Sequence, residues 1–136
     1  MKIYLLLLLT LLINSLLLSA QTNKDIQGTW KGVSSVRTSP SGSYTTDSLK
    51  ENLIKVITQG RIMFTVYSKD NQRLLATGQG AASTNGDQYI ESMEQSTVPT
   101  LLVKPMIFTY KVKGNILTCE GGSKEFHIVE TLVRIE

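Results

Sequence analysis

Two glutamates are the residues of this sequence best placed to do chemistry, because each lies in a segment where residues alternate with a period of two. Glu130 follows Ile128 at two-residue spacing, and Glu91 stands between Tyr89 and Met93 at the same spacing. In a β-strand, residues two apart point to the same face, so both carboxylates are expected to point inward among apolar side chains. Carboxyl groups in such an interior can orient a ligand's polar group, or act as acid and base if their environments separate their pKa values.

Apart from the two glutamates, no feature of the sequence supports catalysis. The chain contains no Gly-x-Ser-x-Gly motif, no glycine-rich phosphate loop and no cluster of histidine with carboxylates. Its single histidine, His127, lacks companion metal ligands, and its single cysteine, Cys119, excludes an intramolecular disulfide. Cys119 is best interpreted as a small buried hydrophobe in an alternating segment. We therefore predict no enzyme activity, no metal site and no cofactor.

A buried carboxylate needs a partner, because leaving it unpaired costs several kcal/mol of folding free energy. Arg134 is a candidate partner for Glu130, since it lies two same-face positions further along the strand. Under one interpretation, the two glutamates form with Tyr89 and Tyr110 a polar patch inside an apolar cavity. Under the other, they belong to a satisfied internal network, or the inward face is assigned wrongly by one residue, which would reverse every position.

The apolar lining of that cavity is expected mainly from the last three strands. Its members there are Met106, Phe108, Tyr110, Val112, Leu117, Cys119, Ile128 and Leu132. Gly78, Gly80 and Ala82 share a face opposite them, where they either leave volume or mark a bend that a closed sheet needs. The ligand-binding residues predicted from the alternation are Tyr89, Glu91, Met93, Phe108, Tyr110, Ile128, Glu130 and Leu132.

These residues are expected to lie on β-strands. Turn signals recur about every 8 to 12 residues, and this spacing is typical of the short strands of a β-sandwich or barrel. Asn85-Gly86 is the strongest hairpin signal, since both residues tolerate the positive φ of a type I′ turn. The polar segment from Thr38 to Ser43 is expected to be a long loop, and Ser96 to Val103 a loop or a single helical turn. The expected strands are Ile26–Val36, Asn52–Thr58, Arg61–Ser68, Arg73–Thr84, Gln88–Gln95, Met106–Lys113, Ile116–Glu120 and Glu125–Ile135.

Short hairpins link nearly every consecutive pair of these strands. The sequence therefore predicts an all-β fold, an antiparallel up-and-down barrel of about eight strands. Closure removes the two exposed edges of an open sheet, and a barrel of this size can hold one small ligand. A two-sheet sandwich is the alternative, although it more often needs long crossover connections.

Residues 1–20 look like an export signal, and residues 21–136 are expected to form a single domain. Lys2 precedes an apolar run, and Leu18-Ser19-Ala20 ends in a small residue before Gln21. The alternative is an uncleaved membrane anchor, while the absence of a following cysteine argues against lipid attachment. We predict an exported protein, periplasmic or secreted, without stable membrane insertion after cleavage.

The charge of the mature chain is nearly balanced. Of the 14 basic residues, losing Lys2 leaves 13 against 11 acidic residues, a net charge of +2. The basic residues are scattered and do not cluster with aromatic ones. The composition therefore predicts no nucleic-acid binding.

Gly28-Thr29-Trp30 and Arg134 together resemble the Gly-x-Trp motif and the last-strand arginine of the lipocalin and related calycin barrels. The resemblance implies a barrel closed at one end by Gly28, Trp30 and Arg134, with a cavity for an apolar ligand. Leu132 and Ala82 depart from the pattern, since such domains often carry Trp and an aromatic residue there. The blocks that look like small exported bacterial lipocalin-like domains are Lys55–Thr58, Met63–Tyr67, Gly78–Gly80, Asn85–Glu91 and Phe126–Arg134.

Two non-enzymatic functions are compatible with these features. The preferred one is a lipocalin-like carrier or sensor that holds a small apolar or amphipathic molecule, with Thr38 to Ser48 as a mobile flap at the mouth. The alternative is an interaction or inhibitory module with a filled barrel, which binds a protein partner through its loops or outer face. Val129, Val133 and Ile135 would form an apolar patch on that face, which is also compatible with a homodimer interface.

Overall fold

The structure of this chain is a computed structural model that describes residues 21–136, and the predicted signal peptide lies outside the described residues. The described part forms one nine-stranded antiparallel sheet with a short 3-10 helix, η1 (Pro99–Leu102). None of its helices is long and apolar enough to cross a membrane. The strands are β1 (Gly28–Ser39), β2 (Gly42–Asp47), β3 (Glu51–Ile57), β4 (Arg61–Ser68), β5 (Leu74–Asn85), β6 (Gln88–Ser96), β7 (Met106–Lys113), β8 (Ile116–Gly122) and β9 (His127–Arg134).

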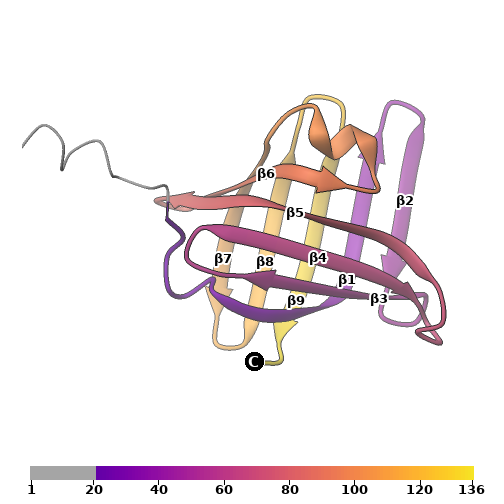
Figure 1. Cartoon of the computed structure of the whole chain (residues 1–136), viewed down its shortest axis with the longest axis horizontal. Coiled ribbons are helices and arrows are strands. Elements are labelled where there is room, and N and C mark those ends of the chain that lie inside the picture. Colours follow the sequence, from indigo (N-terminus) through magenta and orange to yellow (C-terminus); the bar gives the residue numbers. More distant parts are fainter. Residues whose placement is uncertain (1–20) are drawn as a thin grey trace, which may run out of the picture.

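The sheet closes on itself because β1 pairs with β9, the last strand. Without β2, the remaining eight strands form an antiparallel barrel in the order β1-β3-β4-β5-β6-β7-β8-β9. In Figure 1, β3 to β6 run across the front of the barrel and β7, β8, β9 and β1 cross behind them. This arrangement confirms the predicted all-β, up-and-down barrel of eight strands and excludes the sandwich.

The segment from Thr38 to Ser48 is not the predicted flap loop, because most of it belongs to a β-hairpin. β1 continues to Ser39, and β2 pairs antiparallel with its second half. Tyr44, Thr45 and Thr46 have side chains that favour strands. In addition, β3 pairs with β1 only as far as Lys31, which leaves the rest of that edge of β1 free for β2. A polar composition therefore misled the prediction at this position.

One end of the barrel is closed by Trp30 and Arg134. The guanidinium carbon of Arg134 lies 4.1 Å from the Trp30 ring centroid, and its nitrogens donate to the carbonyls of Gln27 and Asp25. The indole Nε1 donates to the carbonyl of Ile26 at 2.8 Å. A stacked cation of this kind contributes about 0.5 to 2 kcal/mol, while its donors satisfy otherwise open carbonyls. The largest fully buried side chains of the interior are Trp30, Tyr89, Phe108, Ile26, Ile57, Ile62, Leu117 and Leu132.

Gly78 and Gly80 allow neighbouring atoms to approach the backbone of β5 closely, and they do not leave empty space in the interior. A Cβ on Gly80 would lie 2.0 Å from the Ser92 carbonyl oxygen, at the point where the β5–β6 register shifts. A Cβ on Gly78 would lie 2.6 Å from the Phe64 ring, which fills the space beside it. Of the two interpretations of these glycines, the structure favours the bend.

Candidate functional site

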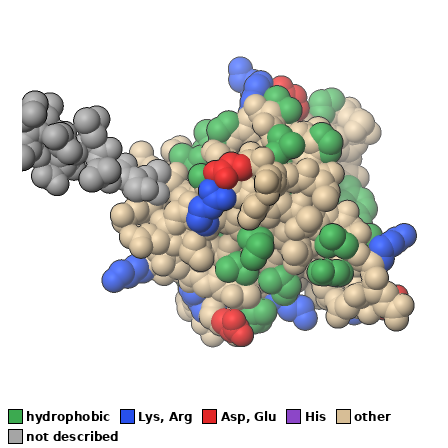
Figure 2. Space-filling view, in the orientation of Figure 1, with side chains coloured by type: hydrophobic (Ala, Val, Ile, Leu, Met, Phe, Trp, Pro, Cys, Tyr) green, Lys and Arg blue, Asp and Glu red, His purple; other side chains and the backbone are tan. Residues whose placement is uncertain are grey.

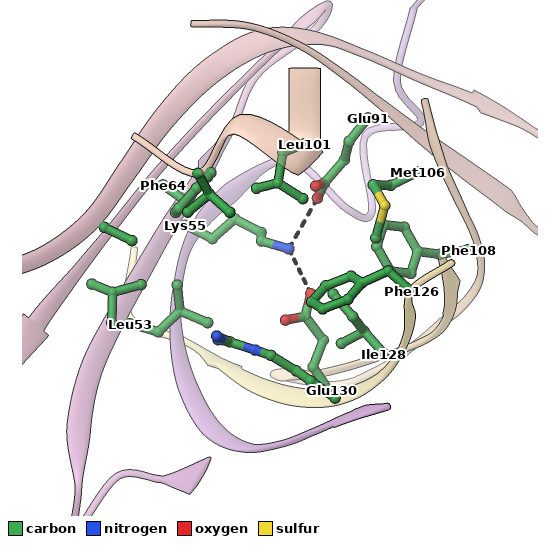
Figure 3. Close-up of a pocket in the computed structure, with 14 residues that line it drawn as sticks. Leu53, Lys55, Phe64, Glu91, Leu101, Met106, Phe108, Phe126, Ile128 and Glu130 are labelled. Atoms are coloured by element: carbon green, nitrogen blue, oxygen red, sulfur yellow. Dashed lines mark hydrogen bonds and ion pairs between the residues drawn. The ribbon is translucent and has the colours of Figure 1, made fainter. Parts of the chain in front are cut away.

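A buried ion cluster of Lys55, Glu91 and Glu130 lies inside the barrel. Lys55 Nζ donates to Glu91 Oε1 at 2.9 Å and to Glu130 Oε1 at 2.5 Å. Figure 3 shows the ammonium between the two carboxylates, with Leu101 and Phe126 nearby. The three residues come from β3, β6 and β9, so side chains from three separated parts of the chain meet at one point.

Alternation along each strand turns these charged groups inward. On β3, Leu53, Lys55 and Ile57 are all buried at two-residue spacing. On β6 and β9, Glu91 and Glu130 take the same inward positions. Each of the three charged residues is 5 or 6% exposed. Burial of an ion to this degree requires a partner, and here each ion has one.

The cluster keeps Lys55 charged. Burial by itself would lower the pKa of the Lys55 ammonium, but the negative charges of Glu130 and Glu91 outweigh this desolvation and raise its pKa above the ordinary value of 10.5. The ammonium also lies 5.7 Å from the centroid of the Phe108 ring. A permanently protonated lysine of this kind is a donor, and it is not suited to act as a nucleophile or general base.

A cavity of about 90 Å³, partly open to solvent, ends at this cluster. It lies toward the end of the barrel opposite Trp30, since its lining comes from the second half of β1, the beginning of β9 and the segment around η1. Most of the lining is apolar, as in ligand sites that hold an apolar body against a few polar groups. The lining residues are Arg37, Leu53, Lys55, Phe64, Val66, Ala76, Glu91, Val98, Leu101, Met106, Phe108, Phe126, Ile128 and Glu130.

The mouth of the cavity is formed by η1 and by a second ion pair. Leu101 of η1 packs against the buried core and lines the cavity. Arg37 also lines it, and its Nη2 lies 3.4 Å from Glu51 Oε1. The Arg37 side chain is 30% exposed and that of Glu51 10%, so this pair lies between the interior and solvent.

Two further polar groups lie behind the cluster, away from the cavity. The Tyr89 ring stacks on Phe108 at 6.0 Å, and its hydroxyl makes no hydrogen bond of ordinary geometry within residues 21–136. Burial, followed by the charge of Glu91, raises the pKa of the Tyr89 phenol well above 10.0. Burial likewise raises the pKa of the Cys119 thiol above 9.0. Both groups are therefore neutral at ordinary pH and add no charge to the interior.

The eight residues predicted as ligand-binding divide into two groups. Glu91, Phe108, Ile128 and Glu130 line the cavity, whereas Tyr89, Met93, Tyr110 and Leu132 are buried without lining it. Tyr110 belongs to the closed end, since its hydroxyl accepts from Asn23 Nδ2 at 2.8 Å. Leu132 is completely buried in the core.

The predicted partner of Glu130 was wrong, because Arg134 contacts Trp30 and backbone carbonyls, and Lys55 binds Glu130 instead. Lys55 was missed as a site residue. Its signal was present in the sequence, since it occupies the inward position between Leu53 and Ile57. Lysine is seldom found inside a protein without a partner, so its presence in this alternation could have indicated a match for the two glutamates.

No protein-family model, curated protein or solved structure matches this chain. Within residues 21–136, no group of three His, Cys, Asp or Glu side chains that could hold a metal ion is found. The fold and the site therefore define the class: an eight-stranded antiparallel barrel with one additional strand, and an internal cavity that ends at a buried ion cluster.

The outer surface carries several exposed apolar side chains. On the face shown in Figure 2, hydrophobic side chains lie in small separate groups with charged residues spread between them. On the outer side of β1 and β9, Val36 and Val129 are direct cross-strand neighbours and both are exposed. Val133, another member of the predicted apolar patch, is a cross-strand neighbour of Ile116.

Proposed function

We propose that this protein is an exported, lipocalin-like binding protein that holds a small amphipathic molecule in its barrel. The observation that carries the proposal is the cavity itself, which is apolar along its sides and ends at buried charged groups with known positions. An apolar wall with a few fixed polar groups is the usual design of a small-molecule site. The Trp30–Arg134 closure and the export signal expected in residues 1–20 support the proposed class and location.

The size of the cavity restricts the ligand. Its volume of about 90 Å³ is below the roughly 150 Å³ of a cavity that binds benzene, and below the roughly 300 to 1,000 Å³ of drug-sized sites. A short chain fits with its polar end at the cluster and the remainder directed past Leu101 and Phe126. A larger ligand requires these mouth residues to move.

The test is a search for bound material, followed by titration. The full chain would be expressed, and native mass spectra of the purified protein would be compared with spectra after mild denaturation. An environment-sensitive apolar dye would then be titrated into the protein, with Glu94→Gln as a control at an exposed carboxylate of β6 that is paired with Arg61. A co-purifying molecule, or saturable one-to-one dye binding that short-chain lipids displace, supports the proposal. A folded protein with neither property would overturn it.

A second candidate function is a protein-interaction module. The neighbouring exposed side chains of Val36 and Val129 give this candidate a specific surface. Apolar groups that gather on a surface often mark an interface, including one between two copies of the chain. Sedimentation of the wild type and of Val129→Lys tests it, because loss of an associated species in the variant alone would identify this face as an interface.

A further inference from the structure

We infer that the ligand presents a primary ammonium group to Glu91 and Glu130, so that the cavity selects short-chain amines over the corresponding carboxylic acids. This inference rests on the proposed function, since it names the class of ligand for the same cavity. Its basis is an imbalance of charge and of hydrogen-bonding groups around Lys55.

The buried ion cluster at the inner end of the cavity carries an excess of negative charge when its groups are ionised. One ammonium, that of Lys55, contacts two carboxylates. The other cation of the lining, Arg37, is already paired with Glu51. The buried cluster of Lys55, Glu91 and Glu130 thus has one positive and two negative charges when ionised. In an interior of low effective dielectric, an uncompensated charge is costly, so a ligand cation at this place is favoured.

The free hydrogen-bonding atoms point to the same class of ligand. Within residues 21–136, Lys55 donates to the Oε1 atom of each glutamate, which leaves the Oε2 atoms. The Glu91 carboxylate also has the Tyr89 hydroxyl as a neighbour, whereas Glu130 has, in this described part of the chain, no side-chain donor other than Lys55. The Oε2 atoms are acceptors on carboxylates that form part of the cavity lining. A ligand ammonium supplies three donors, which matches this demand better than a hydroxyl with one donor or a carboxylate with none.

A carboxylate ligand would be repelled by Glu91 and Glu130. It would bring a third carboxylate to the one ammonium of Lys55, with Glu91 and Glu130 already in contact with it. The guanidinium of Arg37, the other cation of the lining, already compensates the charge of Glu51. Repulsion between like charges in a partly buried site reduces affinity, so the anion is expected to bind worst.

The apolar lining indicates that the part of the ligand beyond its ammonium group is apolar. Phe108, Ile128 and Phe126 lie beside the carboxylate of Glu130 (Figure 3), and Leu101 lies above the cluster on η1. A short alkyl chain attached to the ammonium would lie against these side chains on its way to the mouth. Each methylene buried against these side chains adds favourable transfer free energy.

The test uses three probes with one alkyl chain and different head groups: hexylamine, hexanol and hexanoate. Each is titrated into the protein near neutral pH by isothermal calorimetry, with backbone amide shifts followed by NMR to locate the binding. We expect affinity in the order amine, alcohol, acid, with at least about a tenfold difference between the first and the last, which corresponds to about 1.4 kcal/mol. The shifts should centre on β6 and β9.

Variants then test the source of the preference. Glu91→Gln and Glu130→Gln keep the size of the side chain and remove one negative charge each, so each should lower the preference for hexylamine over hexanoate by about tenfold. Glu94→Gln, on the exposed side of β6, should leave the preference unchanged. If a variant does not fold, the order of the three probes on the wild-type protein still decides.

The outcomes separate this inference from the proposed function. Hexanoate binding as tightly as hexylamine or tighter, with saturable binding overall, would overturn the ammonium preference and leave a small-molecule site in place. Failure of all three probes and of the dye to bind a folded protein would overturn both. Hexylamine bound best, with the preference reduced in Glu91→Gln or Glu130→Gln but not in Glu94→Gln, would establish the inference.

Discussion

Lys55 on β3 and Glu130 on β9 form a 2.5 Å ion pair although their strands are not neighbours in the sheet. β1 lies between these strands, where Trp30 pairs with Lys55 and Ser35 pairs with Glu130. The side chains therefore meet inside the barrel, over β1, and Glu91 extends the contact to β6. The cluster joins three parts of the wall that the backbone ladder does not connect directly.

Lys55→Met is expected to destabilise the protein strongly. The substitution keeps a similar volume but leaves two carboxylates in the interior without their cation, and breaking a buried ion pair in this way costs about 3 to 5 kcal/mol. Urea denaturation, followed by the fluorescence of Trp30, measures the change in the free energy of unfolding. A loss below about 1 kcal/mol would show that the two glutamates do not depend on Lys55.

The matched variant replaces all three charged residues. Lys55→Met combined with Glu91→Met and Glu130→Met removes the desolvation cost together with the attraction, and such replacements are often neutral or stabilising. We therefore expect the triple variant to regain most of the stability lost in Lys55→Met. The same variant should bind hexylamine no better than hexanol, since its cavity no longer carries a charge.

Alkaline pH should destabilise the fold in a defined order. The pKa values of Cys119, Tyr89 and Lys55 are all raised in the folded state, from ordinary values of 9.0, 10.0 and 10.5. Folded protein therefore holds these protons while the unfolded chain releases them, so the stabilising contribution is complete below each ordinary value and is lost as pH rises above it. Each group contributes a slope of about 1.4 kcal/mol per pH unit.

The measurement is the free energy of unfolding from neutral to strongly alkaline pH. We expect a plateau below pH 9.0, the ordinary value of the Cys119 thiol, then a decline that steepens as Tyr89 and Lys55 begin to contribute. Cys119→Ala should remove the earliest part of the decline and leave the later part. A decline that begins at the same pH in this variant would contradict the assignment to Cys119.

The sequence predicted the barrel well because its signal is local. Alternation with a period of two and hairpin turns such as Asn85-Gly86 are properties of neighbouring residues, and they locate the eight strands of the barrel. β2 was missed because its pairing depends on where β3 separates from β1, which no local pattern records. Lys55 was missed although it occupies an inward position between Leu53 and Ile57, because its carboxylate partners lie in distant segments that the local alternation does not connect to it.

The β5–β6 contact allows a sharp test of packing at a position without a side chain. Gly80→Ala would place a methyl group 2.0 Å from the carbonyl oxygen of Ser92 and 2.7 Å from the Cα of Met93. Both are backbone atoms that cannot turn away, so we expect a loss of about 3 kcal/mol or more. Gln79→Ala, at the exposed neighbouring position, should change stability by less than about 0.5 kcal/mol. Equal effects in thermal unfolding of the two variants would contradict the observed register.

Leu101 should control access to the cavity. It lines the cavity from η1 and is partly buried, whereas the next residue, Leu102, is exposed. Leu101→Ala removes apolar bulk at the mouth, so association and dissociation of the apolar dye should both become severalfold faster. Because the side chain is only partly buried, the cost in stability should lie below the roughly 2 to 5 kcal/mol of a fully buried leucine.

Leu102→Ala is the matched control, since it shortens the same kind of side chain one position along the same helix. Stopped-flow fluorescence of dye binding compares the two variants with the wild type at equal protein concentration. If Leu101 of η1 restricts entry to the cavity, the rates of dye association and dissociation change in Leu101→Ala and stay unchanged in Leu102→Ala. Rates that are unchanged in Leu101→Ala would place the route to Lys55, Glu91 and Glu130 elsewhere, with the β1–β2 hairpin beside Arg37 as the next segment to truncate.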